Sequence, residues 1–321
     1  MMWRAFTLCI AACAAACATA ADYPERPLRI LTPFSAGSTT DIVARPLAVK
    51  LSEAWGQPVV VDNRAGAGGS IAAEIVAKAT PDGHTLLIGA TGPNAINPSL
   101  IKNMSYDSQR AFAPITLTSS NNLLLAVSMA VPVKSVRELV DLAKAKPGQL
   151  RFASPGTGSS PHLAGELFKS LAGIDLTHVP YKGSPQYVID LLAARIDLSI
   201  GAAGPVLPHA KSGRLRLLGT SASKRDPAMP DVPTISEAGV PGFEVVGWYG
   251  LLTTAGTPVA VVRKLHSEVV RILALPDVKT IYANGGMDVA ASSSPAAFDA
   301  YIRSERDKWA KVIKTAGIRM E

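Results

Sequence analysis

Short apolar runs alternate with helical patterns along almost the whole chain of 321 residues. The run PLRILTPF precedes an apolar pattern of helical spacing over 41–55, and QPVVVDN precedes another over 71–79. Further along, the same alternation returns in LTHVPY, YVIDLLAAR, IDLSIG, PVLPHAKSG and RLRLLGTS. Strands that alternate with helices are typical of parallel sheets covered by helices. The sequence therefore predicts an α/β fold.

The chain is long for a single sheet of this kind, so we expect two α/β lobes. Two extended segments, 123–133 and 241–252, are candidates for strands that run between the lobes. If both cross, lobe 1 consists of 22–122 plus 244–321, and lobe 2 consists of 123–243. A ligand then binds in the cleft between the lobes, outside the carboxyl ends of the strands.

The first 21 residues have the pattern of a secretory signal peptide. Arg4 precedes a nearly unbroken apolar run over 5–18 that is too short for a membrane span, and small residues follow it. We expect cleavage after Ala20 or Ala21 and a location in the periplasm. A second interpretation stays open, because IAAC, ending at Cys13, loosely resembles a lipoprotein cleavage box, which would leave a lipid-tethered protein.

Composition excludes several classes of function. All three cysteines (Cys9, Cys13 and Cys17) lie in the leader, so the mature chain is expected to have no thiol, disulfide or cysteine metal ligand. The formal net charge is +7, the charges are dispersed, and no basic run is interleaved with aromatic residues. We therefore expect no nucleic-acid partner. The five histidines show no metal-ligand spacing, and no metal site is predicted.

The sequence also lacks the common catalytic motifs. It contains no G-x-S-x-G, no phosphate-binding P-loop and no H-E-x-x-H. The segment 63–79 begins like a dinucleotide fingerprint, but Ile71 stands where the third glycine is required. We therefore predict no enzyme activity and no cofactor.

Four loops rich in Gly, Ser and Thr each follow an expected strand, namely PFSAGSTTD, GATGPNAINP, ASPGTGSSPH and GAAGP. Loops at this topological position line a common cleft in α/β proteins. Their backbone N–H groups and hydroxyls can bind an anion, and the lack of an Arg cluster favours a carboxylate over a phosphate. The candidate ligand-binding residues are Phe34, Ser35, Gly37, Ser38, Thr39, Thr91, Ser154, Thr157, Gly158, Ser159 and Ala202.

The third of these loops leads into a clearly marked helix. Ser160 is expected as its N-cap, Pro161 as its first residue and Gly173 as its C-terminal stop. His162 is the one histidine inside a glycine-rich loop, and both packing in the first helical turn and contact with a ligand stay open for it. Asp41, in the first loop, is interpreted as a cap or a first-turn charge of its own helix.

Several segments resemble a known family when taken together. These segments, which follow one another in the family's order and span nearly the whole mature chain, are YPERPLRILTPFSAGSTTDIVAR, VVVDNRAGAGGSIAAE, DGHTLLIG, HVPYKG, PDVPTISEAGVPGFEVVGWYGL and AGTPVAVVRKL. They are similar to the extracytoplasmic solute receptors of tripartite tricarboxylate transporters, often called the Bug family. The resemblance implies a type II periplasmic-binding-protein fold, with two lobes, two crossing strands and a closing cleft. It also implies that PFSAGSTTD meets one ligand carboxylate, partly through waters, and that SPGTGSSPH meets the ligand from the opposite lobe.

One of these segments departs from the family pattern. Where the family usually carries Pro-Pro-Gly-Gly, this chain has Ser35, Ala36, Gly37 and Ser38. Ser38 places a side chain where the ligand or its waters would lie, so we expect the water-mediated contact and the choice of ligand to differ.

The resemblance leaves two roles open. A monomeric receptor could capture a small mono-, di- or tricarboxylate and deliver it to the membrane permease subunits of a tripartite transporter. Alternatively, a ligand-sensing co-receptor could bind such an acid and dock on a signalling protein.

Overall fold

The computed structural model describes residues 23–101 and 103–318. The expected signal peptide and the three cysteines lie outside the described residues. Within the described part of the chain, no helix has both the length and the apolar character that a membrane span requires.

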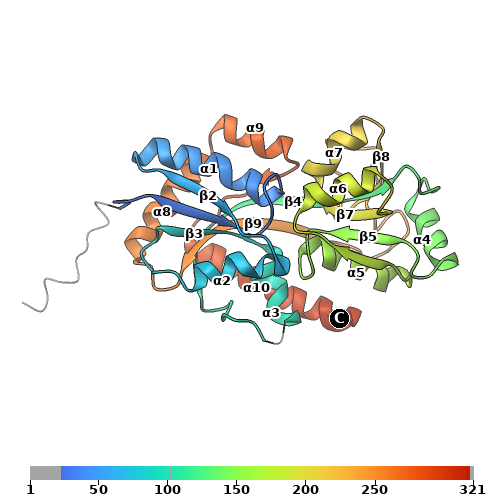
Figure 1. The fold of residues 1–321 in the computed structure, drawn as a ribbon, viewed down its shortest axis with the longest axis horizontal. Helices are drawn as coiled ribbons and strands as arrows, with labels where there is room; N and C mark the ends of the chain where they lie inside the picture. Colours follow the sequence, from blue (N-terminus) through green and yellow to red (C-terminus); the bar gives the residue numbers. More distant parts are fainter. Residues whose placement is uncertain (1–22, 102, 319–321) are drawn as a thin grey trace, which may run out of the picture.

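In the described part of the chain, ten strands form one continuous sheet that falls into two groups, which we call lobe 1 and lobe 2 (Figure 1). In lobe 1 the central strand β1 pairs in parallel with β2 and β3, and β9 pairs antiparallel with β3. In lobe 2 the strand β5 pairs in parallel with β6 and β7. The strands of lobe 1 are β1 (Leu28–Thr32), β2 (Val59–Asn63), β3 (Thr85–Ala90), β9 (Val246–Thr254) and β10 (Asp288–Val289). The strands of lobe 2 are β5 (Arg151–Ser154), β6 (Thr177–Pro180), β7 (Leu198–Ala202) and β8 (Leu215–Thr220).

One long strand, β4 (Phe112–Ser128), belongs to both lobes. Its residues 112–122 pair with β9, and its residues 123–128 pair with β7 and β8. A second connection runs beside it, because Ser221 hydrogen-bonds the backbone of both Leu123 and Val245. The chain thus passes between the lobes within the two segments that were candidates from the sequence. The lobe boundaries, 22–122 plus 244–321 for lobe 1 and 123–243 for lobe 2, stay a prediction.

Helices cover both faces of this sheet, with α1 and α9 on one face of lobe 1 and α2 and α10 on the other (Figure 1). Most apolar residues of α1 point inward, and Val43, Leu47 and Leu51 are fully buried, whereas Val49 is exposed. The helices of lobe 1 are α1 (Thr39–Trp55), α2 (Ser70–Ala77), α3 (Asn97–Leu100), α8 (Val259–Leu273) and α9 (Pro276–Asn284), with short 3₁₀ and π turns at η2 (Ala67–Gly69) and η3 (Gly92–Ile96). The helices of lobe 2 are α4 (Val136–Ala145), α5 (Ser160–Ala172), α6 (Ser184–Leu192) and α7 (Ala203–Lys211).

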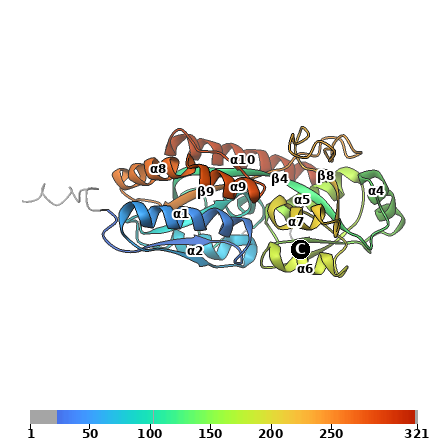
Figure 2. The same ribbon diagram turned by 90° about the horizontal axis from the view of Figure 1, so that it is seen from above.

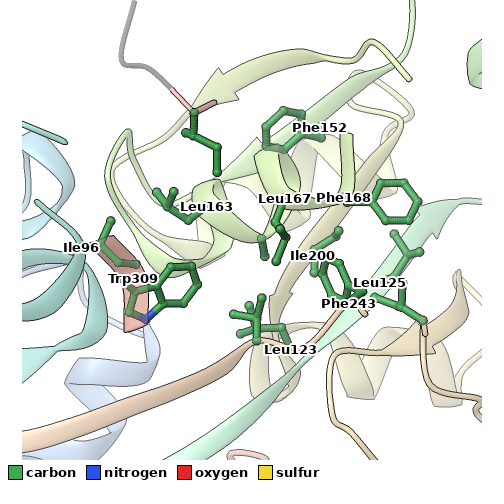
Figure 3. Close-up of a cluster of buried hydrophobic side chains, with 14 of the residues drawn as sticks. Ile96, Leu123, Leu125, Phe152, Leu163, Leu167, Phe168, Ile200, Phe243 and Trp309 are labelled. Carbon is green, nitrogen blue, oxygen red and sulfur yellow. The ribbon is translucent and has the colours of Figure 1, made fainter. Parts of the chain in front are cut away.

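The last helix, α10 (Pro295–Ala316), runs from one lobe to the other (Figures 1 and 2). Near its start, the ring of Phe298 packs edge-on against Trp248 of β9, with ring centroids 5.8 Å apart. Near its end, Trp309 is 1% exposed and belongs to the same apolar cluster as Leu163 of α5 (Figure 3). The end of this helix therefore packs on lobe 2, while the assignment of 244–321 to lobe 1 stays a prediction.

Candidate functional site

A small cavity lies between the lobes, at the edge of the sheet where the four predicted loops meet. Its volume is about 20 Å³, which is enough for roughly one water molecule. A cavity of this size admits a larger molecule only after the lobes separate. The cavity is lined by Phe34, Ser38, Thr39, Thr40, Ala90, Gly92, Pro155, Ser159, Ser160, Pro161, Ser184, Ala202 and Tyr249.

The starts of several helices converge on this cavity. Residues at or next to the starts of α1, α5, α6, α7 and η3 contribute to the lining. The first N–H groups of a helix have no partner within it, and the N-terminal end carries a partial positive charge. Among the described residues that line the cavity there is no Arg, Lys or His. The site can therefore stabilise an anion with neutral donors alone.

Two buried hydroxyls in the lining lack a well-formed hydrogen bond. Oγ1 of Thr40, a residue that is 0% exposed, is unpaired, and Oγ1 of Thr39, a residue that is 4% exposed, has only the phenol of Tyr249 as an interaction partner. An unpaired buried polar group costs about 1–3 kcal/mol, so these hydroxyls would be stabilised by a polar ligand. Tyr249 of β9 adds a phenol whose pKa is raised by burial, so it stays a protonated donor.

The first loop forms a tight turn at the start of α1, which we call the lobe-1 turn (residues 35–41). Gly37 is left-handed, with φ 77°, and its N–H donates to the Asp41 carboxylate at 2.9 Å. The same carboxylate accepts hydrogen bonds from Nε of Arg45 at 2.7 Å and from Nδ2 of Asn63 at 3.0 Å. Burial raises the pKa of Asp41, but the bonds from Arg45, Gly37 and Asn63 outweigh it and hold the pKa below its usual value. Asp41 therefore stays ionised and fixes the turn.

The third loop forms a similar turn at the start of α5, which we call the lobe-2 turn (residues 156–162). Gly158 is left-handed, with φ 85°, and its N–H donates to Nδ1 of His162 at 3.1 Å. The predicted N-cap Ser160 is wrong, because the cap is Ser159 and the helix begins at Ser160. Ser159 has the extended backbone of a cap, and its hydroxyl accepts the N–H of His162 at 3.4 Å. The predicted stop at Gly173 is confirmed by its left-handed backbone.

Five of the eleven candidate ligand-binding residues line the cavity: Phe34, Ser38, Thr39, Ser159 and Ala202. Two others face into the protein, because Oγ1 of Thr91 accepts the N–H of Trp248 at 2.9 Å and Oγ of Ser154 lies 2.7 Å from Nε2 of His178. A direct ligand contact for any of the eleven stays a prediction.

The remaining four candidates lie where the two lobes touch beside the cavity. The N–H of Ser35 donates to the carbonyl of Lys182 at 3.1 Å, across the cleft. Gly37 lies against Pro185, and a Cβ built on Gly37 would stand 3.3 Å from that ring. A Cβ on Gly158 would stand 2.2 Å from Oδ1 of Asn97, and one on Gly68 would stand 2.1 Å from the carbonyl oxygen of Thr157. These close approaches explain why glycine occupies positions 68 and 158.

Several lining residues were missed by the sequence reasoning. Ser184 and Tyr249 come from outside the four loops, and Thr40 and Gly92 lie inside them without having been singled out. Ser184 is the first residue of α6 and directly follows HVPYKG. Its position after a strand could have indicated that it lines the cavity. Ser184 also bridges the lobes, because its N–H donates to Oγ of Ser38 at 3.2 Å. No group of three or more His, Cys, Asp or Glu side chains in the described part of the chain is placed to hold a metal ion.

Comparisons with known proteins identify the family. Residues 43–318 match the family model TctC, described as "Tripartite tricarboxylate transporter family receptor". The "UPF0065 protein in tcbD-tcbE intergenic region" of Pseudomonas sp. (strain P51) is 39% identical over 292 residues, which cover 91% of this chain and 86% of that protein. "Protein BugT" of Bordetella pertussis is 35% identical over 301 residues, covering 93% and 92%. The resemblance noted in the sequence is confirmed.

Solved structures agree with this assignment. "R. palustris Rpa4515 with adipate" superposes with a TM-score of 0.88 and 37% identity, covering 93% of this chain and 99% of that one. "Structure of periplasmic binding protein BugD" gives 0.88 and 34%, covering 93% and 100%. "MatC (Rpa3494) from Rhodopseudomonas palustris with bound malate" gives 0.87 and 32%, covering 91% and 100%. The expected periplasmic-binding-protein-like α/β fold is confirmed.

Proposed function

Because the chain belongs to the tripartite tricarboxylate transporter receptor family, we propose that it is a periplasmic receptor for a small organic acid. The acid binds by a carboxylate in the cavity between the lobes, and the receptor delivers it to the membrane permease of a tripartite transporter. Two solved structures of the same fold are complexes with adipate and with malate, which supports this class of ligand.

The observation that carries the proposal is a cavity lined by helix starts and hydroxyls without any cation. Charge-assisted hydrogen bonds contribute about 1.5–3 kcal/mol each. Four such bonds, less the free energy needed to close and order the lobes, leave about 8 kcal/mol, which corresponds to micromolar affinity. A carboxylate suits this lining better than a phosphate, whose charge is usually met by arginine.

A ligand screen tests the proposal directly. The mature protein is melted in the presence of adipate, malate and citrate, with adipamide, glucose and inorganic phosphate as matched controls. At about one hundred times its dissociation constant, a true ligand stabilises the protein by about 2.7 kcal/mol, which raises the Tm by several degrees. Adipamide should give no shift, because it cannot form charge-assisted bonds. A sugar or phosphate that stabilises the protein more than every acid would refute the proposal.

A pair of threonine variants assigns the site. Thr39→Val removes one hydroxyl from the cavity, whereas Thr280→Val removes an exposed hydroxyl on α9. We expect Thr39→Val to weaken acid binding by about tenfold, the effect of one lost charge-assisted bond. The free energy of unfolding should fall by no more than about 1 kcal/mol, because within the protein this hydroxyl interacts only with the phenol of Tyr249. Equal affinities for both variants would place the acid elsewhere.

A further inference from the structure

The lobe-1 and lobe-2 turns are built in the same way. In each, a left-handed glycine precedes a serine, and the glycine N–H donates to the side chain four residues along, in the first turn of a helix. Asp41 accepts from Gly37 at 2.9 Å, and Nδ1 of His162 accepts from Gly158 at 3.1 Å. His162 thus occupies the position in lobe 2 that a charged carboxylate occupies in lobe 1.

We propose that His162 is the positioning residue of the lobe-2 turn, holding Gly158 and the N–H groups that follow it in place for the ligand. His162 does not line the cavity, so it acts through Gly158 and not by touching the acid. The inference rests on the proposed function, because the ligand of this turn is the organic acid. The sequence left open whether His162 packs in the first helical turn or contacts the ligand. The proposal gives His162 a positioning role instead.

The surroundings of the ring fix its orientation. His162 is 5% exposed, and its ring stacks on Phe152 of β5, with a 7° angle between the planes and centroids 6.4 Å apart. The ring of His178 on β6 lies 4.1 Å away on centroids. On α5 itself, Nε2 of His162 lies 4.0 Å from Oε1 of Glu166. These contacts leave Nδ1 directed at the N–H of Gly158.

An imidazole accepts at Nδ1 only when it is neutral, with its proton on Nε2. Burial lowers the pKa of His162 to about 4, and the positive charge of Lys169 acts in the same direction. His178 is also neutral, because burial and the neighbouring His162 lower its pKa to about 3. The ring therefore remains an acceptor throughout the neutral pH range.

Gly158, whose N–H is held by His162, lies where the two lobes are in contact. A Cβ on Gly92 would come within 2.7 Å of the carbonyl oxygen of Gly158, and Gly158 itself lies against Asn97. Loss of the acceptor leaves the N–H of Gly158 buried and unpaired, and the turn shifts to satisfy it. A small shift here moves the cavity wall formed by Ser159 and Ser160 and alters the contact with lobe 1.

The test compares two substitutions. His162→Asn keeps an acceptor, because its Oδ1 occupies nearly the place of Nδ1, whereas His162→Leu removes it. His84→Leu is the control, since His84 is also 5% exposed but lies in lobe 1, where its ring contacts Tyr23. We expect His162→Leu to raise the Kd for adipate or malate about tenfold, the effect of one lost hydrogen bond, with His162→Asn and His84→Leu close to the original value.

A ligand-free measurement separates this inference from the proposed function. Amide hydrogen exchange at Gly158 should be about tenfold faster in His162→Leu, with protection restored in His162→Asn. If the unaltered protein binds neither acid, the proposed function fails for them, while the exchange rates still decide the role of His162. If His162→Leu does not fold, ¹⁵N NMR of the unaltered ring decides, because only the Nε2–H tautomer can accept from Gly158. Equal losses in His162→Asn and His162→Leu, unchanged exchange in His162→Leu, or an Nδ1–H tautomer would overturn the inference.

Discussion

The two turns that face each other across the cavity have nearly the same backbone, but the anchor of one is charged and the anchor of the other is neutral. In lobe 1 the anchor is an ionised carboxylate, and its Arg45 partner has a side chain that is 58% exposed, so the network reaches the surface. In lobe 2 the anchor is a neutral imidazole closed in by Phe152 and His178. The same glycine N–H can thus be held by a charge or by a neutral ring. The difference governs how each turn responds to substitution and to pH.

The capping serines of the two turns also differ. The hydroxyl of Ser159 stays within its own turn, where it donates to the carbonyl of Gly156 at 2.6 Å and accepts the N–H of His162. Ser38 makes no cap bond to its helix, and its hydroxyl instead accepts the N–H of Ser184 from the other lobe. One serine therefore stabilises a helix, whereas the other stabilises the contact between lobes.

The largest difference is expected from removing the charged anchor. Asp41→Ala leaves the N–H of Gly37, the amide of Asn63 and the guanidinium of Arg45 without their shared acceptor. Asp41 is 3% exposed and its bonds to all three donors are partly buried, so we expect the free energy of unfolding to fall by about 3 kcal/mol, against about 1 kcal/mol for His162→Leu. Urea unfolding measures both. Glu53→Ala, on the exposed face of the same helix, is the control, and equal losses for Asp41→Ala and His162→Leu would show that the charge adds nothing.

As the pH is lowered, the anchor of the lobe-2 turn should lose its contribution to stability before the anchor of the lobe-1 turn does. The pKa of His162 falls from 6.5 to about 4 on folding, so the unfolded chain binds more protons between these values and stability falls as the pH falls through them. From pH 7.5 to pH 5, His162 alone accounts for a loss of about 2 kcal/mol. Asp41 has a folded pKa below 3.8, so its contribution is present above that value and is lost only at lower pH.

Urea unfolding at a series of pH values checks this order. His162→Asn should reduce the slope of the profile between pH 7.5 and pH 5 by about half, because one titrating ring is gone. The remaining slope comes from His178, whose pKa of about 3 gives a loss of about 2 kcal/mol over the same range. A profile identical to that of the unaltered protein would show that His162 does not remain neutral on folding.

The convergence of the loops could be predicted from sequence because strand ends in an α/β sheet meet at one edge. The strand expected in HTLLIGA is β3, and the loops after β1, β3, β5 and β7 all reach one cavity. The pairing of Gly158 with His162 could not be predicted, since it depends on a left-handed backbone and a ring orientation set by Phe152. Ser160 was taken for the cap because neighbouring serines have the same propensity, and only the backbone angles distinguish them.

The reach of α10 into lobe 2 was also not readable from the sequence. Its apolar residues predict a buried face, but they do not say which lobe buries it. Tertiary contacts decide this, because the hydroxyl of Ser170 on α5 donates to the carbonyl of Ala316 at 3.4 Å. Tyr249 was missed for a related reason: an alternating strand shows which residues share a face, but not that the face reaches the cavity.

The smallest expected effects come from the two serines, and they should differ in kind. Ser159→Ala removes a helix cap and should lower the free energy of unfolding by about 1 kcal/mol. Ser38→Ala removes no cap, and the N–H of Ser184 that loses its acceptor can reach water when the lobes separate, so stability should fall by less than in Ser159→Ala. The bond from Ser184 to Ser38 forms only when the lobes are together, and binding draws on closure. Ser38→Ala should therefore raise the Kd for the bound acid several-fold, chiefly through faster dissociation. Urea unfolding and stopped-flow release of the acid measure the two quantities. If Ser38→Ala destabilised the fold and left the dissociation rate unchanged, the two serines would have the same role. The two turns would then differ only in their anchoring side chains, Asp41 and His162.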